Sequence, residues 1–224
     1  MAVTTRRERR EQERRKREKR RGGGGPHVPS TRGINQIWLV VGVIVLVIAL
    51  LAVGRAAGVF EAPPPPVNVN SSEFDTTGQT IGTKVEDLGN AHIPTGQKAK
   101  YNSVPPTSGE HWASPAAPAP AGIKDVALPN EVTTHNLEHG GIVIAYNNLP
   151  ADDVSKLKAL FRQLTAAGYA KMILEPYPDL KDATIALTAW DWILKLPGFD
   201  QTSVVKFIRA HYDGPDAPEH GVPF

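Results

Sequence analysis

The chain has 224 residues and no cysteine, which excludes disulfides, zinc–thiolate sites, iron–sulfur clusters and cysteine nucleophiles. Its formal charge of +2 hides an asymmetry: residues 1–32 hold twelve Lys or Arg against four Glu, whereas residues 56–224 hold twelve against nineteen Asp or Glu. We therefore expect the two ends of the chain to face different surroundings, and the acidic second part argues against nucleic acid as a partner.

The first segment is strongly basic. Residues 6–21 read RRERREQERRKREKRR and have no apolar face, so they cannot bury a core. Glutamates at helical spacing from arginines favour a transient helix, which the four glycines at 22–25 would end. We interpret residues 1–32 as a basic cytoplasmic tail that contacts anionic lipid headgroups. A nucleic-acid-binding arm is the alternative interpretation.

An aliphatic segment without charged residues follows at 33–54. It predicts a transmembrane helix at residues 33–55, since about 20 apolar residues cross a hydrocarbon core of about 30 Å. The basic cluster before it places the N-terminus in the cytoplasm, so we expect a single-pass protein of the cell membrane with its remaining part extracytoplasmic. A cleavable signal peptide is the competing interpretation. Residues 56–79, which include four consecutive prolines, are predicted to form an extended linker.

The remaining chain predicts one small α+β domain at residues 80–213, followed by a tail at 214–224. Its first half is rich in proline and glycine and predicts short strands and ordered loops. Its second half predicts a β-α-β-β-α order. The predicted elements are a strand at 141–146, a helix from Pro150 to Gly168, strands at 169–174 and 184–190, and a helix capped by Asp200 that runs to about 210. The expected core residues are Leu157, Phe161, Ile173, Leu187, Trp190 and Phe207.

The segment from Thr133 to Tyr146 places two imidazoles and a carboxylate within five residues and then enters the first predicted strand. If the five residues form a helical turn, His135 and His139 are at i and i+4 and share one face. If they form a loop, two following glycines let the backbone turn tightly into the strand. Both conformations place titratable groups at the start of a core element.

Four of the seven histidines precede the regular half of the domain: His92, His111, His135 and His139. Imidazoles without thiols suit Zn²⁺ or Cu²⁺, so we predict that these four residues form a metal site. The residues expected to support the ligands are Glu138, Glu110, Asn136 and Ser108. Either glutamate would orient a ligand imidazole or act as a general base on a metal-bound water.

Three strings in order resemble one family: YNSVPPTSGEHW, LPNEVTTHNLEHGG and IALTAW. They resemble an uncharacterised family of bacterial envelope proteins catalogued as a domain of unknown function (3105), over about residues 85–212. The resemblance implies a membrane-tethered or secreted location, and it names no activity. The signature residues that it implies are Tyr101, Pro105, Pro106, Ser108, Gly109, His111, His135, Asn136, Glu138 and His139, with His92 as a further match.

Three functions remain open at this point. The first is a membrane-anchored, extracytoplasmic module that binds Cu or Zn through the histidines. The second is a metal-dependent envelope enzyme that uses Glu138 or Glu110 as base. The third is a structural or interaction subunit without metal, whose protein partner the sequence does not identify. An open coordination position beside a carboxylate would favour the enzyme, and histidines too scattered for one ion would favour the subunit.

Overall fold

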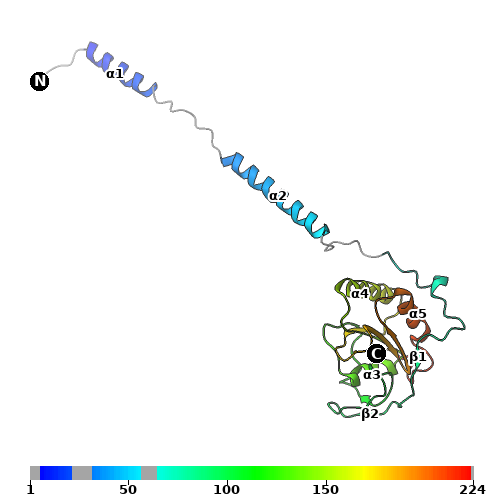
Figure 1. Cartoon of the computed structure of the whole chain (residues 1–224). Coiled ribbons are helices and arrows are strands. Elements are labelled where there is room, and N and C mark those ends of the chain that lie inside the picture. Colours follow the sequence, from blue (N-terminus) through cyan, green and yellow to red (C-terminus); the bar gives the residue numbers. More distant parts are fainter. Residues whose placement is uncertain (1–5, 22–31, 57–64, 223–224) are drawn as a thin grey trace. The chain divides into compact units, whose positions relative to one another are not determined.

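The computed structural model describes residues 6–21, 32–56 and 65–222 of the chain. The chain divides into two compact units, residues 1–62 and 63–224. Over the described residues the architecture is mixed α+β, with five α-helices and eight short strands (Figure 1). The α+β class predicted from the sequence agrees with this architecture.

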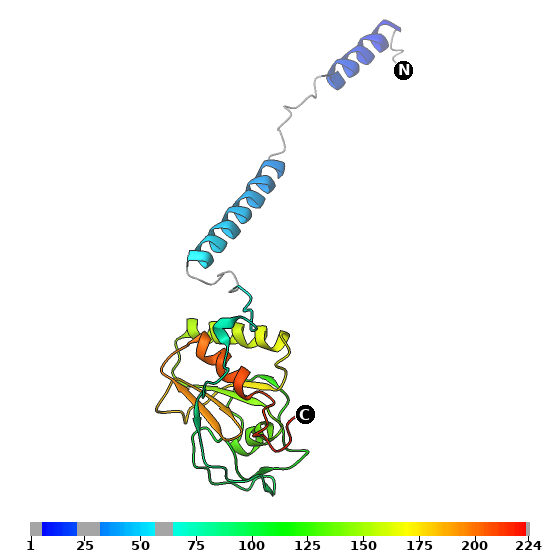
Figure 2. The same cartoon turned by 90° about the vertical axis from the view of Figure 1, so that its right-hand side faces the viewer.

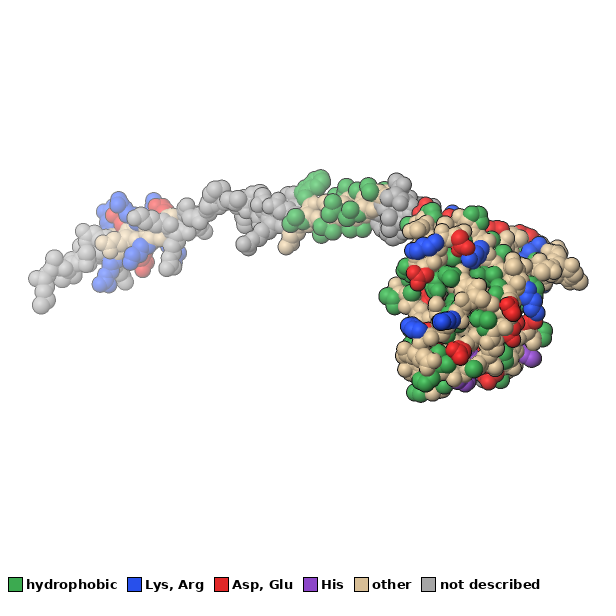
Figure 3. All heavy atoms as spheres, turned by 60° about the horizontal axis from the view of Figure 1, so that its bottom comes forward, with side chains coloured by type: hydrophobic (Ala, Val, Ile, Leu, Met, Phe, Trp, Pro, Cys, Tyr) green, Lys and Arg blue, Asp and Glu red, His purple; other side chains and the backbone are tan. Residues whose placement is uncertain are grey.

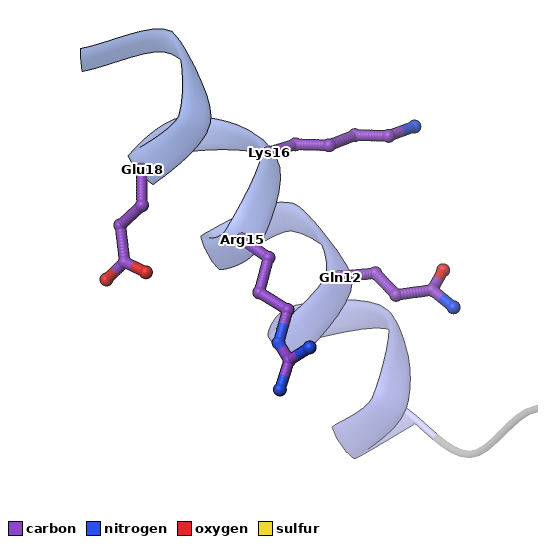
Figure 4. A pocket seen from close by; sticks show the side chains of 4 residues that line it. All are labelled: Gln12, Arg15, Lys16 and Glu18. Atoms are coloured by element: carbon purple, nitrogen blue, oxygen red, sulfur yellow. The ribbon is translucent and has the colours of Figure 1, made fainter. Parts of the chain in front are cut away.

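The basic segment forms helix α1, Arg6–Arg21. Its described side chains are exposed, and Arg14 Nε lies 3.6 Å from Glu18 Oε1 at i,i+4 spacing. Figure 4 shows Gln12, Arg15, Lys16 and Glu18 projecting from α1 in different directions. The predicted helix is thus present. The predicted glycine break at 22–25 and residues 57–64 of the predicted linker (56–79) lie outside the described residues.

Helix α2 spans Arg32–Ala56, and the apolar side chains described in it are exposed (Figure 3). Within the part of the chain that the structure describes, no helix is both long and apolar enough to cross a membrane. The prediction of a transmembrane helix at residues 33–55 is therefore wrong on this finding.

The second unit is built on a six-stranded sheet with the order β1-β8-β7-β5-β6-β4. Strand β5 is parallel to β6 and antiparallel to β7, and these three strands are buried along almost their whole length. Burial on both faces explains their continuous apolar sequences. In the order of the sheet, the strands are β1 (Thr83–Lys84), β8 (Trp192–Leu196), β7 (Ile185–Ala189), β5 (Ile142–Tyr146), β6 (Met172–Pro176) and β4 (Gly122–Ile123).

Helices cover both faces of this sheet (Figures 1 and 2). Helices α4 (Ala151–Ala166) and α5 (Gln201–His211) pack on one face, where Ile144 belongs to the larger apolar core. Helix α3 (Asn130–Glu138) lies on the other face, where Val143 belongs to a second core. Because successive side chains of a strand point to opposite faces, β5 supplies both cores.

The second half of the unit largely follows the sequence prediction. The strands at 142–146 and 185–189 and both helices are present, and Asp200 caps α5 by accepting a hydrogen bond from Thr202 N. Strand β8 was not predicted: the chain turns at Asp191, whose φ is 63°, and returns beside β7. The order is therefore β-α-β-β-β-α. All six predicted core residues are buried, namely Leu157, Phe161, Ile173, Leu187, Trp190 and Phe207.

Segments on both sides of the predicted domain also join the packed unit. Val69 and Phe74 belong to the larger core, although the sequence analysis assigned them to the linker. At the other end, Ala217 belongs to the second core. Hydrogen bonds from Asp213 N to Gly140 O (2.8 Å) and from Glu219 N to Glu138 O (2.9 Å) hold the C-terminal segment against the end of α3.

Candidate metal centre

A short parallel ribbon brings the first two histidines together. Strands β2 (His92–Ile93) and β3 (His111–Trp112) pair in parallel with His92 opposite His111. Residues directly opposite each other in a parallel pair project to the same face, so the two imidazoles are neighbours. Their ring centroids lie 4.7 Å apart.

Helix α3 supplies the other two groups. The segment that the sequence left open between helix and loop is helical, and His135 and Glu138 share a face at i,i+3 spacing. His135 Nδ1 lies 2.6 Å from the backbone oxygen of Trp112, which ties α3 to β3. His139 is the residue at which the helix ends.

The four side chains converge on one point. One ligand atom from each of His92, His111, His135 and Glu138 lies within 4.8 Å of the others. Glu138 Oε2 lies 3.0 Å from Nε2 of His111, 3.7 Å from Nε2 of His92 and 3.8 Å from Nε2 of His135. A tetrahedral ion with ligand bonds of about 2 Å separates its ligand atoms by about 3.3 Å. The cluster therefore has nearly the dimensions of a first coordination shell.

Backbone carbonyls fix which ring nitrogens face this point. Nδ1 of His111 lies 2.8 Å from Gly109 O, and Nδ1 of His135 contacts Trp112 O. A carbonyl oxygen only accepts, so each Nδ1 is the donor and each Nε2 is left for the site. This arrangement is the usual support of a metal-bound imidazole. Because the Glu138 carboxylate also only accepts, its approach to Nε2 of His111 is favourable with a cation at that point, either a proton or a metal ion.

The centre is buried except on one side. The side chains of His111, His135 and Glu138 are 0%, 7% and 2% exposed, whereas that of His92 is 47% exposed, so the centre opens to solvent at His92. Histidine atoms are visible on the surface of the second unit in Figure 3. Burial lowers the pKa of His135, against the opposing effect of its hydrogen bond to Trp112 O. The neutral imidazole, which is the form that binds metals, is therefore favoured.

The fourth predicted ligand, His139, lies beside this group rather than within it. Its ring stacks on that of His135 with an interplanar angle of 10°, and the two Nε2 atoms are 3.1 Å apart. Glu138, which the sequence analysis placed behind the ligands, occupies the fourth place in the four-residue group. His139 instead belongs to a second group, with Glu138 and Glu219, whose ligand atoms also lie within 4.8 Å of one another.

The other three predicted supporting residues have different surroundings. Asn136 exchanges two hydrogen bonds with the backbone of Ala119, of 3.0 and 2.8 Å, and so fixes the proline-rich segment to α3. The Ser108 hydroxyl accepts a hydrogen bond of 3.1 Å from Leu88 N. Glu110 is exposed and belongs to neither group of candidate ligands among the described residues.

Two residues of the centre escaped the sequence analysis. Asn90 Nδ2 donates a hydrogen bond of 2.9 Å to Glu138 Oε1 and so orients the other carboxylate oxygen toward the imidazoles. Glu219, in the predicted tail, places its Oε2 3.4 Å from His139 Nδ1. Neither position is part of a local pattern, because both contacts join residues that are far apart along the chain.

Comparison with known proteins gives one match. Residues 92–223 match the model of a family described as Protein of unknown function (DUF3105), which covers more than half of the chain and all four residues of the cluster. No curated protein matches the chain, and no solved structure does.

Proposed function

Because this chain belongs to the family described as Protein of unknown function (DUF3105), which brings no activity with it, we propose from the geometry alone that its second unit binds a divalent transition metal ion. The ligands are His92, His111, His135 and Glu138. The observation that carries this proposal is the convergence of their ligand atoms within 4.8 Å, with Nδ1 of two imidazoles already held by backbone carbonyls.

The donor set favours Zn²⁺ or Cu²⁺. Three neutral imidazoles and one carboxylate are nitrogen and oxygen donors of intermediate softness, which both ions accept. The chain has no cysteine, and Met172, its only methionine beyond Met1, lies in the apolar core. A thiolate or thioether site for Cu⁺ is therefore not part of the proposal.

The alternative function, a metal-dependent enzyme with Glu138 or Glu110 as its general base, gains no support from the geometry. A general base on a metal-bound water must stand beside the metal without being bound to it. Glu138 lies among the candidate ligands, and Glu110 belongs to neither group. An extracytoplasmic location and contact of the basic segment with anionic lipid stay predictions.

The proposal is tested on the full chain by elemental analysis and by thermal melts in chelator, in Zn²⁺ and in Cu²⁺. An ion that binds only the native state at a hundredfold excess over its dissociation constant stabilises it by about 2.7 kcal/mol. For a unit of this size that free energy raises the melting temperature by about 5–10 °C. His92→Ala removes a half-exposed ligand, so we expect it to fold and to lose most of this shift.

Gln97→Ala is the matched control, because Gln97 is exposed in the same irregular half and lies outside both groups. We expect it to keep the full shift. Equal melting temperatures in chelator, Zn²⁺ and Cu²⁺, together with a purified chain that holds no metal, would overturn the proposal. A structural role for the histidines would then take its place.

A further inference from the structure

We infer that the centre holds a second divalent metal ion, bound by Glu138, His139 and Glu219, and that Glu138 is shared by the two ions. This inference rests on the function proposed above and extends it. One ligand atom from each of the three residues lies within 4.8 Å of the other two. Since Glu138 also belongs to the four-residue group, the two positions meet at a single buried carboxylate.

The hydrogen bonds of the two stacked imidazoles determine which atom of His139 coordinates. His135 Nδ1 donates to Trp112 O, so its Nε2 carries a lone pair. His139 Nε2, 3.1 Å away, must therefore supply the proton of the hydrogen bond between the rings. A neutral imidazole carries one ring proton, which leaves the lone pair of His139 on Nδ1. Coordination of the first ion by His135 Nε2 removes the acceptor of this hydrogen bond, and the approach of Glu219 Oε2 to within 3.4 Å of Nδ1 then favours Nδ1 as the coordinating atom of His139.

That lone pair faces a carboxylate. Nδ1 of His139 lies 3.4 Å from Glu219 Oε2, and neither atom is a donor in the neutral state of the imidazole. Two acceptors at this distance are held together by a cation between them, either a proton on the imidazole or a metal ion. The separation is also close to the spacing of about 3.3 Å between two ligands of one tetrahedral ion.

The C-terminal segment holds Glu219 in place. Glu219 N donates to Glu138 O at 2.9 Å, and Ala217, two residues earlier, is buried in the second core. Asp213 accepts a hydrogen bond of 2.7 Å from Gly221 N, which closes the segment around Glu219. The backbone of Glu219 is thus fixed at the end of α3, while its side chain is 45% exposed and gives an ion access from solvent.

Charge sets the order of binding. The first ion meets three neutral imidazoles and one carboxylate, which leaves one net positive charge. A second ion brings two further positive charges, and the only new negative charge among its ligands is the Glu219 carboxylate. Like charges that share one ligand repel each other, as in two-metal sites with a separation of about 3.5–4 Å. We therefore expect the second ion to bind more weakly than the first.

Zn²⁺ titration of the chelator-treated full chain, followed by calorimetry and by elemental analysis after equilibrium dialysis, tests the inference. The expected wild-type result is two ions per chain in two steps of different affinity. Glu219→Gln removes the charge at a half-exposed side chain, so the fold is kept, and the stoichiometry falls to one. Glu110→Gln, an exposed glutamate outside both groups, keeps both ions.

The alternative outcomes separate this inference from the proposed function. If the wild type binds one ion and Glu219→Gln also binds one, the first site is intact and the His139–Glu219 contact is only an ion pair. This result overturns the inference and leaves the proposed function standing. Two ions that both persist in Glu219→Gln place the second ion elsewhere and also overturn it. A chain that binds no ion overturns the inference and the proposed function together.

Discussion

The hydrogen bond from Asn90 to Glu138 provides a sharp test of how the centre is organised. Asn90 Nδ2 lies 2.9 Å from Glu138 Oε1, whereas Oε2 of the same carboxylate faces the imidazoles. Without the amide, the carboxylate of the metal-free protein can rotate away from the imidazoles. Metal binding must then reorder it. Asn90→Ala should therefore weaken metal binding without removing a ligand.

The size of the effect follows from the contact and its exposure. Loss of a hydrogen-bond partner behind a metal ligand typically weakens binding 10–100-fold, which is about 1.4–2.7 kcal/mol. The Glu138 side chain is only 2% exposed, but Asn90 itself is exposed, so water can partly replace its amide. We therefore expect the lower end of the range, a dissociation constant for Zn²⁺ raised about 10-fold.

The assay is competition for Zn²⁺ between the full chain and a chromophoric chelator. Asn102→Ala is the matched control, since Asn102 is also an exposed asparagine in the irregular half and its amide donates a 2.8 Å hydrogen bond to Glu86 O. Its dissociation constant should equal that of the wild type. If Asn90→Ala binds Zn²⁺ within about twofold of the wild type, or if both variants are weakened equally, the orienting role assigned to Asn90 is refuted.

Two further predictions concern stability. Burial raises the pKa of Glu175 to about 7, above its unfolded value, so its contribution to stability is complete below the unfolded pKa and is lost as pH rises through about 7. In denaturant melts, the wild type should lose up to about 3 kcal/mol of unfolding free energy between pH 5 and 8.5 through this carboxyl group. Glu175→Gln should abolish this part of the loss, and an unchanged pH dependence in the variant would contradict the prediction. A Cβ at residue 141 would lie 2.5 Å from Asn136 O, so Gly141→Ala should cost about 1–3 kcal/mol. Gly198→Ala, whose Cβ would meet nothing within 4 Å, should leave the melting temperature nearly unchanged, and equal effects of the two variants would exclude the steric cause.

Local patterns in the sequence were enough to predict most of the regular half. The apolar stripe of α4 and the Asp200 cap of α5 act within a few residues, and these elements appear where they were expected. Strand β8 was missed because its partner β7 ends immediately before a tight turn at Asp191, a non-glycine residue with positive φ. The short strands β1 to β4 have two residues each, too few to show any periodicity.

The sequence named most of the residues that the structure brings together in the candidate metal centre, but not their arrangement. His92 and His111 were named as ligands, but the register that places them side by side comes from pairing between distant segments. In α3, Glu138 and His139 lie three and four residues after His135. Glu138 faces His92, whereas His139 lies at the end of the helix. Asn90 and Glu219 reach Glu138 and His139 through contacts that no local pattern signals.

The division of the fold into two halves explains why the site was harder to predict than the sheet. The larger core joins β5, β6 and β7 to α4 and α5 with apolar side chains, and none of the candidate ligands among the described residues belongs to it. The irregular half has only two-residue strands, and side-chain hydrogen bonds such as those between Asn136 and Ala119 attach it to α3. An ion bound by His92 and His111 from that half, and by His135 and Glu138 from α3, would join the two parts directly. The free energy of metal binding would then act mainly on the order of the irregular half, because the sheet and its helices already have an apolar core without it.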